Sequence, residues 1–352
     1  MTRFAVFLAT AATALSFSTV ARAADAELTV FDWAGWDIEG AYAQYKAKHG
    51  DGPTYAFFGD DDEAFQKVSS GFKADIAHPC AASVPRYRDA GLIEPWDTAK
   101  IEAFANIPPH LLNSTVFKDD QGLWFLPLDY AYTAIAYNTN DVPAEDVATL
   151  QVFKDPKYAG RISLPDSADD IWSLAFLATG VTSWDNVTDE QFAAAAAWLR
   201  EVHPNVRAYW ADPAEMTQLM ASGEVQVAWS WNDGVALLQA ENFAVGYNRT
   251  PKEGSSTWLC GYVNMMDAPG NEDKVYDFVN SVMSDGGTAA VVENIGYATS
   301  NAAAMAKLPA EAIQKAYLDP LPEGSILFMQ SPTSPELRAK MIEEFELIKT
   351  GF

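Results

Sequence analysis

Residues 126–138 read LPLDYAYTAIAYN, an apolar and aromatic run in which Asp129 is the single charged side chain. Short runs rich in Tyr, Ile, Leu and Thr are typical of β-strands with little exposed surface. We expect this segment to form a long pair of strands. Predicted helices and strands alternate on both sides of it along the chain, and this alternation indicates an α/β sandwich.

The alternation occurs twice, once in each half of the chain. Before residue 126, strands are expected at 26–33, 53–58 and 74–78, with helices at 37–49, 62–72 and 84–90. After it, strands are expected at 160–164 and 225–231, with helices at 171–179, 189–201, 216–222, 274–283, 286–293 and 334–348. No linker rich in Pro, Gly or Ser separates the halves, so we expect the chain to pass between them within strands. The sequence therefore predicts two α/β lobes around a hinge and a cleft.

The first 23 residues have the three parts of a secretory signal peptide. A basic start, MTR, precedes the apolar residues 4–20, and residues 21–23 (ARA) supply the small-x-small pattern that signal peptidase reads. We expect cleavage after Ala23 and export of a soluble protein. A membrane anchor is the weaker alternative, because serine and threonine side chains shorten the apolar run.

The charge balance is strongly acidic, with 48 Asp and Glu against 23 Lys and Arg and a formal net charge of −25 in 352 residues. Such a surface repels phosphate backbones and anionic lipid headgroups, which argues against nucleic acid and membrane surfaces as partners. It favours cationic ligands. The two cysteines, Cys80 and Cys260, are too few for a disulfide-dense scaffold or for a zinc site built mainly from cysteine.

Catalytic and cofactor-binding motifs are missing from the sequence. It contains no GxSxG, HExxH, P-loop or GxGxxG pattern. The four histidines lie far apart, and the pair formed by His78 and Cys80 falls short of a metal motif. We interpret His78 as a loop or core residue rather than a base. The chain is predicted to have no enzymatic activity and to hold neither a cofactor nor a metal.

Aromatic side chains beside acidic ones are the more informative signal. Cleft walls are often built from strand ends and short loops, where we expect Trp33, Trp36, Tyr130, Tyr132, Trp172, Trp229, Trp231, Trp258 and Tyr297. Carboxylates close to them in sequence are Asp37, Asp129, Asp166, Asp169, Asp170 and Asp233. The face of a Trp ring attracts an ammonium group, and a carboxylate then fixes the charge. This pattern suits an organic cation, with core packing as the alternative for any single Trp.

Four segments together carry a resemblance to a known family. They are residues 30–33 (VFDW), residues 74–79 (ADIAHP) with 88–95 (RDAGLIEP), residues 127–138, and residues 293–301 (ENIGYATSN). Their order and spacing resemble the periplasmic spermidine/putrescine-binding proteins of ABC transporters, in which the last segment reads ETIGYPTPN. The resemblance covers nearly the whole chain after residue 23.

The resemblance implies a type II periplasmic-binding-protein fold, in which each lobe is a mixed sheet flanked by helices. Residues 24–133 plus about 262–305 would form lobe 1, and residues 134–261 plus about 306–352 would form lobe 2. The implied protein is a monomeric receptor in the periplasm. It would capture a polyamine such as putrescine or spermidine, close over it, and deliver it to an inner-membrane ABC permease.

The ligand contacts of the family fall on matching positions here. By this resemblance, the residues that flank the carbon chain of a polyamine would be Trp33, Trp36, Trp231, Trp258 and Tyr297. Asp170 would pair with an amine, and Gln330 would be a polar clamp. Further candidate positions are Cys80, Asp129, Ser167 and Cys260. Ser167 and Cys260 stand where the family usually has Asp, so a second ammonium group would lack its partner unless Asp129 supplies one.

Other ligands and activities stay open as alternatives. The ligand could have one cationic end, as in a monoamine, a quaternary amine or an amino acid-like zwitterion. The rival from another class is a secreted hydrolase that uses the carboxylates Asp166, Asp169, Asp170 and Asp129. An anion or a metal in the same fold is disfavoured by the shortage of Arg and His near the expected cleft.

The two cysteines leave a structural alternative. Cys80 is expected on the first lobe and Cys260 near a crossover between the lobes. In an oxidising periplasm they could form a disulfide, and a bond across the cleft would hinder hinge motion. They could equally be two small apolar fillers.

Overall fold

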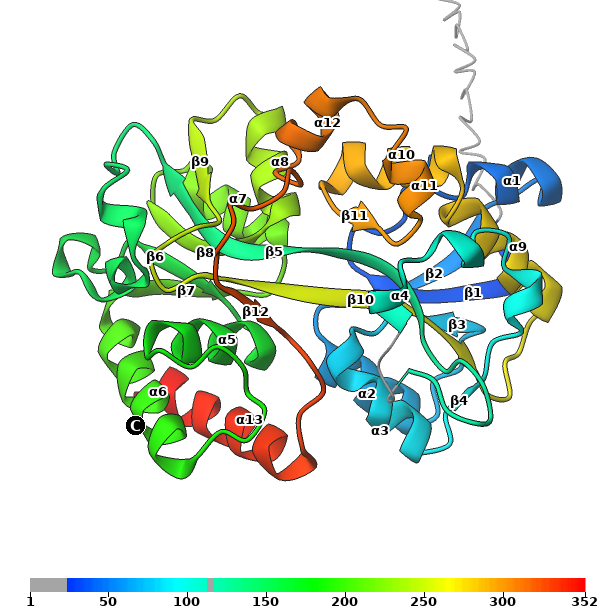
Figure 1. Cartoon of the computed structure of the whole chain (residues 1–352), viewed down its shortest axis with the longest axis horizontal. Helices are drawn as coiled ribbons and strands as arrows, with labels where there is room; N and C mark the ends of the chain where they lie inside the picture. The colour runs from blue at the N-terminus through cyan, green and yellow to red at the C-terminus, as the bar shows by residue number, and fades with distance from the viewer. Residues whose placement is uncertain (1–23, 113–116, 352) are drawn as a thin grey trace, which may run out of the picture.

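The structure, a computed structural model, describes residues 24–112 and 117–351, so the predicted signal peptide lies outside the described residues. The chain forms two lobes joined by two long strands (Figure 1). These are β5 (Leu126–Asn138) and β10 (Ser255–Met265), which pair antiparallel. Of the helices in the described ranges, none has the length and hydropathy of a membrane span.

The first lobe is built around strand β1 (Asp25–Trp33). This strand pairs parallel with β2 (Pro53–Phe58) and β3 (Ile76–Ala77). One end of β10 runs antiparallel to β3 and to β4 (Ile93–Glu94). Helices lie on both sides of this sheet in Figure 1, namely α1 (Ala43–His49) and α9 (Glu272–Val282) on one side, and α2 (Asp61–Ser69) and α3 (Val84–Asp89) on the other. The other short elements outside the second-lobe sheet are α4 (Pro109–Leu112), α10 (Asp285–Ile295), β11 (Ala298–Thr299), α11 (Ala302–Met305) and α12 (Ala310–Lys315).

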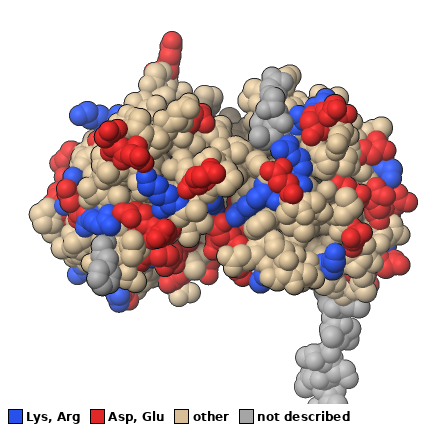
Figure 2. Space-filling view, turned by 90° about the horizontal axis from the view of Figure 1, so that it is seen from below, with Lys and Arg blue, Asp and Glu red and all other residues tan. Residues whose placement is uncertain are grey.

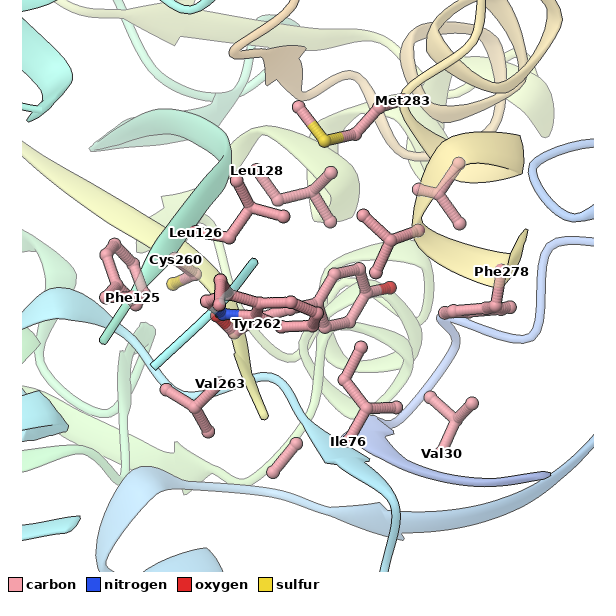
Figure 3. Close-up of a cluster of buried hydrophobic side chains, with 14 of the residues drawn as sticks. Val30, Ile76, Phe125, Leu126, Leu128, Cys260, Tyr262, Val263, Phe278 and Met283 are labelled. Carbon is pink, nitrogen blue, oxygen red and sulfur yellow. The ribbon is translucent and has the colours of Figure 1, made fainter. Parts of the chain in front are cut away.

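A buried apolar cluster holds the first lobe together (Figure 3). Val30 of β1 and Ile76 of β3 pack with Tyr262 and Val263 of β10 and with Phe278 of α9. Each of these side chains is at most 1% exposed. Complete burial of such a side chain contributes about 1.5–3 kcal/mol, so the cluster fixes β10 against β1 and β3.

The second lobe uses the other half of β5. Its sheet contains β6 (Ile162–Pro165), β7 (Val206–Trp210), β8 (Val227–Trp231) and β9 (Val245–Asn248). β8 and β9 are antiparallel to β5, and β6 is parallel to β7 and β8. Its helices are α5 (Ala168–Ala178), α6 (Asp189–Val202), α7 (Pro213–Ala221), α8 (Asn232–Ala240) and α13 (Pro335–Lys349), and β12 (Leu327–Met329) pairs parallel with β10. A second apolar cluster, which includes Trp172 and Trp229, forms its core.

Several predicted elements differ from those in the structure. Residues 126–138 form one continuous strand rather than a pair. The helix predicted over 37–49 begins only at Ala43, after turns at residues 39–42. Within these turns a side chain at Gly40 would collide with Ala290 of α10. β10 was not predicted at all. Every residue of β10 is buried, so it lacks the alternation of a half-exposed strand.

Cys80 and Cys260 form a disulfide bond. The two residues also face each other across an isolated antiparallel β-bridge. Both pack with the apolar cluster of the first lobe. Of the two alternatives that the sequence left open, the structure therefore contains the disulfide, and it ties the loop after β3 to β10 on one side of the cleft.

Removing this disulfide is expected to destabilise the protein without abolishing the fold. The C80S/C260S variant should have a free energy of unfolding about 2–4 kcal/mol lower, because the bond restricts the unfolded chain. The bonded residues are 180 positions apart, so the loop that the bond closes is long. Urea unfolding with and without dithiothreitol measures the effect. Equal midpoints for wild type and variant without reductant would contradict this prediction.

Candidate functional site

A cleft of about 1070 Å³ lies between the two lobes. Figure 2 shows the groove between the two halves of the molecule, with acidic side chains at its edges. All the site residues expected from the sequence line this cleft: Trp33, Trp36, Cys80, Asp129, Ser167, Asp170, Trp231, Trp258, Cys260, Tyr297 and Gln330. Four other aromatic residues were expected in the cleft walls, and this prediction is wrong. Trp172 and Trp229 are fully buried in the second-lobe core, and Tyr130 and Tyr132 lie outside the lining.

Aromatic rings from both lobes meet in the cleft. Trp33 is the last residue of β1 and Trp231 the last residue of β8, and their rings meet edge to face with centroids 6.1 Å apart. Trp258 of β10 and Tyr297 form a second edge-to-face pair at 4.7 Å. The ring of Trp36 lies 6.3 Å from that of Tyr297. The five rings form walls suited to an aliphatic chain or an organic cation.

Asp170 lies in the first turn of α5 and is 3% exposed. Its carboxylate accepts hydrogen bonds from three neutral donors, Thr133 Oγ1 at 2.7 Å, Gln330 Nε2 at 3.0 Å and Trp231 Nε1 at 3.0 Å. Burial raises the pKa of Asp170 to about 6, although the three hydrogen bonds oppose the rise. No cationic side chain of the described residues pairs with it. The carboxylate is therefore oriented but not neutralised.

Asp233 is a second acid in the cleft wall, in the first turn of α8. It is partly buried, and burial raises its pKa to about 7 against the effect of a hydrogen bond from Tyr297. The sequence analysis placed Asp233 among the nearby carboxylates but did not assign it to the site. Its position directly after the strand that ends at Trp231 was the available signal.

His78 lies between two carboxylates, Asp32 of β1 and Asp129 of β5. Its Nδ1 is 2.6 Å from Asp32 Oδ1, and its Nε2 is 2.8 Å from Asp129 Oδ1. All three residues are fully buried. Burial alone would lower the pKa of His78, but the two carboxylates outweigh it and raise the pKa to about 10. The interpretation of His78 as a core residue is right about its burial, but this residue is a buried cation at neutral pH.

An ion pair at the mouth of the cleft joins the lobes. Arg338 of α13 in the second lobe contacts Asp169 of α5 at 2.5 Å and reaches Asp62 of α2 in the first lobe at 2.8 Å. Arg338 could not be predicted as a site residue from local pattern, because 276 residues separate it from Asp62. Asp60 caps α2 by accepting backbone hydrogen bonds from its first turn.

Acidic side chains dominate the lining of the cleft. Thirteen Asp and Glu residues line it, against two cationic residues, Arg338 and Lys349. Lys349 is paired in turn, with Asp166 and Glu346 at 2.7 Å each. Such a field attracts cations and repels anions. Within the described ranges, no three His, Cys, Asp or Glu side chains are grouped so that they could hold a metal ion.

Comparisons with known proteins identify the family and the fold of the chain. The model of the family described as bacterial extracellular solute-binding protein matches residues 40–317. The spermidine/putrescine-binding periplasmic protein of Escherichia coli strain K12 is 25% identical over 317 residues, which cover 89% of this chain and 88% of that protein. A solved structure, a putative spermidine/putrescine ABC transporter from Listeria monocytogenes, has a TM-score of 0.79 at 24% identity over 92% of this chain and 98% of that one.

Proteins of the same fold are also solved with other ligands. MotA from A. tumefaciens B6, in complex with glucopine, has a TM-score of 0.73 at 21% identity, over 92% of this chain and 99% of that one. These structural similarities confirm the predicted type II periplasmic-binding-protein fold. The identity of the ligand is a separate question, which depends on the residues of this cleft.

Proposed function

This chain belongs to the family of bacterial extracellular solute-binding proteins, and we propose that it is the receptor of an ABC importer for a polyamine of the putrescine and spermidine class. The observation that carries the proposal is Asp170, a buried carboxylate with three neutral donors and no cationic partner in the described part of the chain. The names of its relatives in Escherichia coli and Listeria monocytogenes support the ligand class.

A protonated amine would complete the site at Asp170. A buried charge without a partner costs several kcal/mol, and an ammonium group would remove that cost through a charge-assisted hydrogen bond. Gln330 would keep the carboxylate in place. The carbon chain of the ligand would lie against the aromatic residues Trp33, Trp36, Trp231, Trp258 and Tyr297. Further contacts of the pocket wall would come from Cys80, Asp129, Ser167, Asp233 and Cys260.

In the proposed mechanism the ligand closes two lobes, residues 24–133 plus about 262–305 and residues 134–261 plus about 306–352. The two separate apolar clusters support this division except at residues 258–260, which pack with the first cluster. A ligand that contacts both lobes stabilises the closed form only by its higher affinity for that form. The Arg338–Asp62 ion pair would add to closure at the mouth. A periplasmic monomer closed in this way would be the form presented to an inner-membrane permease.

A ligand with one cationic end is the second candidate. Ser167 and Cys260 place a hydroxyl and a disulfide on the cleft lining, where further carboxylates would suit a second ammonium group. The hydrolase alternative has less support. Asp166 and Asp169 are engaged with Lys349 and Arg338, which leaves no free carboxylate pair in that cluster.

A thermal-shift panel on the ligand-stripped protein tests the proposed function. Putrescine, cadaverine and spermidine should raise the melting temperature, since a ligand that binds only the native state stabilises it by about 2.7 kcal/mol at one hundred times its Kd. Butylamine, choline, glycine betaine and γ-aminobutyrate test the second candidate, and butyrate is the anionic control. The absence of a shift with every amine would overturn the proposal.

Amine affinity is expected to fall as the pH falls below neutrality. Asp170 and Asp233 have pKa values raised to about 6 and about 7, so both are largely protonated at mildly acidic pH in the free protein. A cationic ligand favours the ionised carboxylates, so its binding at mildly acidic pH must release protons from them. Calorimetric titrations with putrescine should show a loss of at least about tenfold in affinity over two pH units below neutrality. An affinity independent of pH would contradict this prediction.

A further inference from the structure

Asp129 has one oxygen engaged and one oxygen free. Its Oδ1 accepts from His78 Nε2 at 2.8 Å, whereas its buried Oδ2 has no hydrogen-bond partner among the described residues. The residue lines the cleft although it is fully buried. A buried carboxylate oxygen without a partner is costly and uncommon in native proteins. A donor that enters from the cleft would supply the missing partner of this oxygen.

The neighbours of Asp129 leave the negative charge on it. His78 brings one positive charge to two carboxylates, Asp32 and Asp129, so the group keeps a net charge of −1 when all three are ionised. Asp32 is satisfied by further donors, the Trp33 N–H at 2.8 Å and the Tyr262 hydroxyl at 3.4 Å. Asp32 has its donors and Asp129 has a free oxygen, so the charge that His78 does not neutralise is open to a second cation at Asp129, although burial raises the pKa of this carboxyl.

Strand β5 sets the distance between Asp129 and Thr133, the residue that bonds Asp170. Asp129 and Thr133 lie four residues apart in the regular part of this strand, so their side chains share one face at a spacing of about 13 Å. Thr133 in turn holds Asp170 by a hydrogen bond of 2.7 Å. Between them, Ala131 leaves room opposite Trp258 of β10, which lines the cleft.

Asp129 and Asp170 belong to different lobes. Ala131 packs with the first-lobe cluster and Ala134 with the second, so the boundary between the two cores crosses β5 between these residues. Asp129 lies on the first-lobe side of it, and Asp170 lies in α5 of the second lobe. A carboxylate at each end with an aromatic ring between them is complementary to a chain with a cation at both ends.

We infer that Asp129, held by His78, is a second ammonium site, so that the ligand is an α,ω-diamine or longer polyamine bound by one ammonium group on each lobe. This inference rests on the proposed function and extends it to the number of charges on the ligand. Asp129 would thus be the carboxylate partner of the second ammonium group, which neither Ser167 nor Cys260 can provide. His78 is a positioning residue in this arrangement.

The test compares a diamine with a monoamine of the same chain length. Calorimetry of the wild type should give an affinity for putrescine, or for the longer spermidine, at least about tenfold higher than for butylamine, since a hydrogen bond to a charged group is worth about that factor or more. Spermidine is included because the spacing of about 13 Å along β5 is longer than the span of the four-carbon chain of putrescine. Asp129→Asn should lose most of this preference by weakening putrescine alone. Asp37→Asn, which removes an exposed carboxylate from the same cleft, is the matched control and should keep the preference.

The outcomes separate the two proposals. If the wild type binds no amine, the proposed function fails. If it binds butylamine as tightly as putrescine, or if Asp129→Asn weakens both ligands equally, the second ammonium site is wrong while the receptor stands. A putrescine preference that persists in Asp129→Asn would place the second ammonium group at another acid of the cleft, such as Asp233, and would overturn the inference. An absent preference in the wild type overturns it even if Asp129→Asn does not fold.

Discussion

Replacing Asp170 by asparagine is expected to weaken putrescine binding at neutral pH by at least about one hundredfold, because removing one partner of a buried charge pair costs about 3–5 kcal/mol. The carboxylate is fixed by Thr133, Trp231 and Gln330, and asparagine keeps its size but not its charge. Isothermal titration calorimetry measures the loss. The melting temperature of the ligand-free variant should change little, because the relief of a buried charge offsets the acceptor that is lost towards the Trp231 and Gln330 donors.

Asp166→Asn is the control for Asp170. Asp166 also lines the cleft, but it pairs with Lys349 at 2.7 Å and is far more exposed than Asp170. The two variants lose the same formal charge, so a general electrostatic effect would weaken binding in both. We expect Asp166→Asn to change putrescine affinity by less than about threefold. Equal losses in both variants, or an unchanged affinity in Asp170→Asn, would rule out Asp170 as the ammonium site.

His78→Leu is expected to lower the free energy of unfolding by about 3–5 kcal/mol at neutral pH, because it leaves the buried carboxylates Asp32 and Asp129 without their cation. His203→Leu is the matched control. His203 is half-buried and bonds a tyrosine hydroxyl at 3.0 Å instead of a carboxylate. Urea unfolding should show a much smaller loss for this variant.

The pH dependence of stability distinguishes lost charge from lost packing at His78. The pKa of His78 is raised from 6.5 to about 10, so its stabilising contribution is complete below about pH 6.5 and decreases as the pH rises towards 10. The wild type should therefore lose stability over this window. His78→Leu should lack this component of the loss. In the double variant His78→Leu/Asp129→Asn, the second substitution should lower the free energy of unfolding by less than Asp129→Asn lowers it in the wild type. Parallel pH profiles for wild type and His78→Leu would contradict the charge assignment.

The sequence was informative where a residue lies next to a strand end. Trp33 and Trp231 follow strands that were predicted close to their true limits, so their place in the cleft could be expected. β10 gives no such signal, because a strand buried on both faces has no alternation. The pattern of aromatic residues included Trp258 but placed it at a strand end or loop, and the position of Cys260 was accessible only through the family resemblance.

Contacts between distant segments could not be predicted from local pattern. His78 is 46 residues from Asp32 and 51 from Asp129, and the three meet because the sheet places β1, β3, β10 and β5 in this order. The Arg338–Asp62 pair depends in the same way on the closure of two lobes. Single-sequence reasoning identifies such residues as candidates by type, but their partners follow only from topology.

The most direct test of the account is a calorimetric titration of putrescine into the ligand-stripped wild-type protein. The account predicts saturable binding of one ligand per chain, with proton release to the buffer when the pH lies near the pKa values of Asp170 and Asp233, about 6 and about 7. Butyrate should give no binding heat. No saturable heat with putrescine, or an equal response to butyrate, would contradict the assignment of this cleft to a cationic amine.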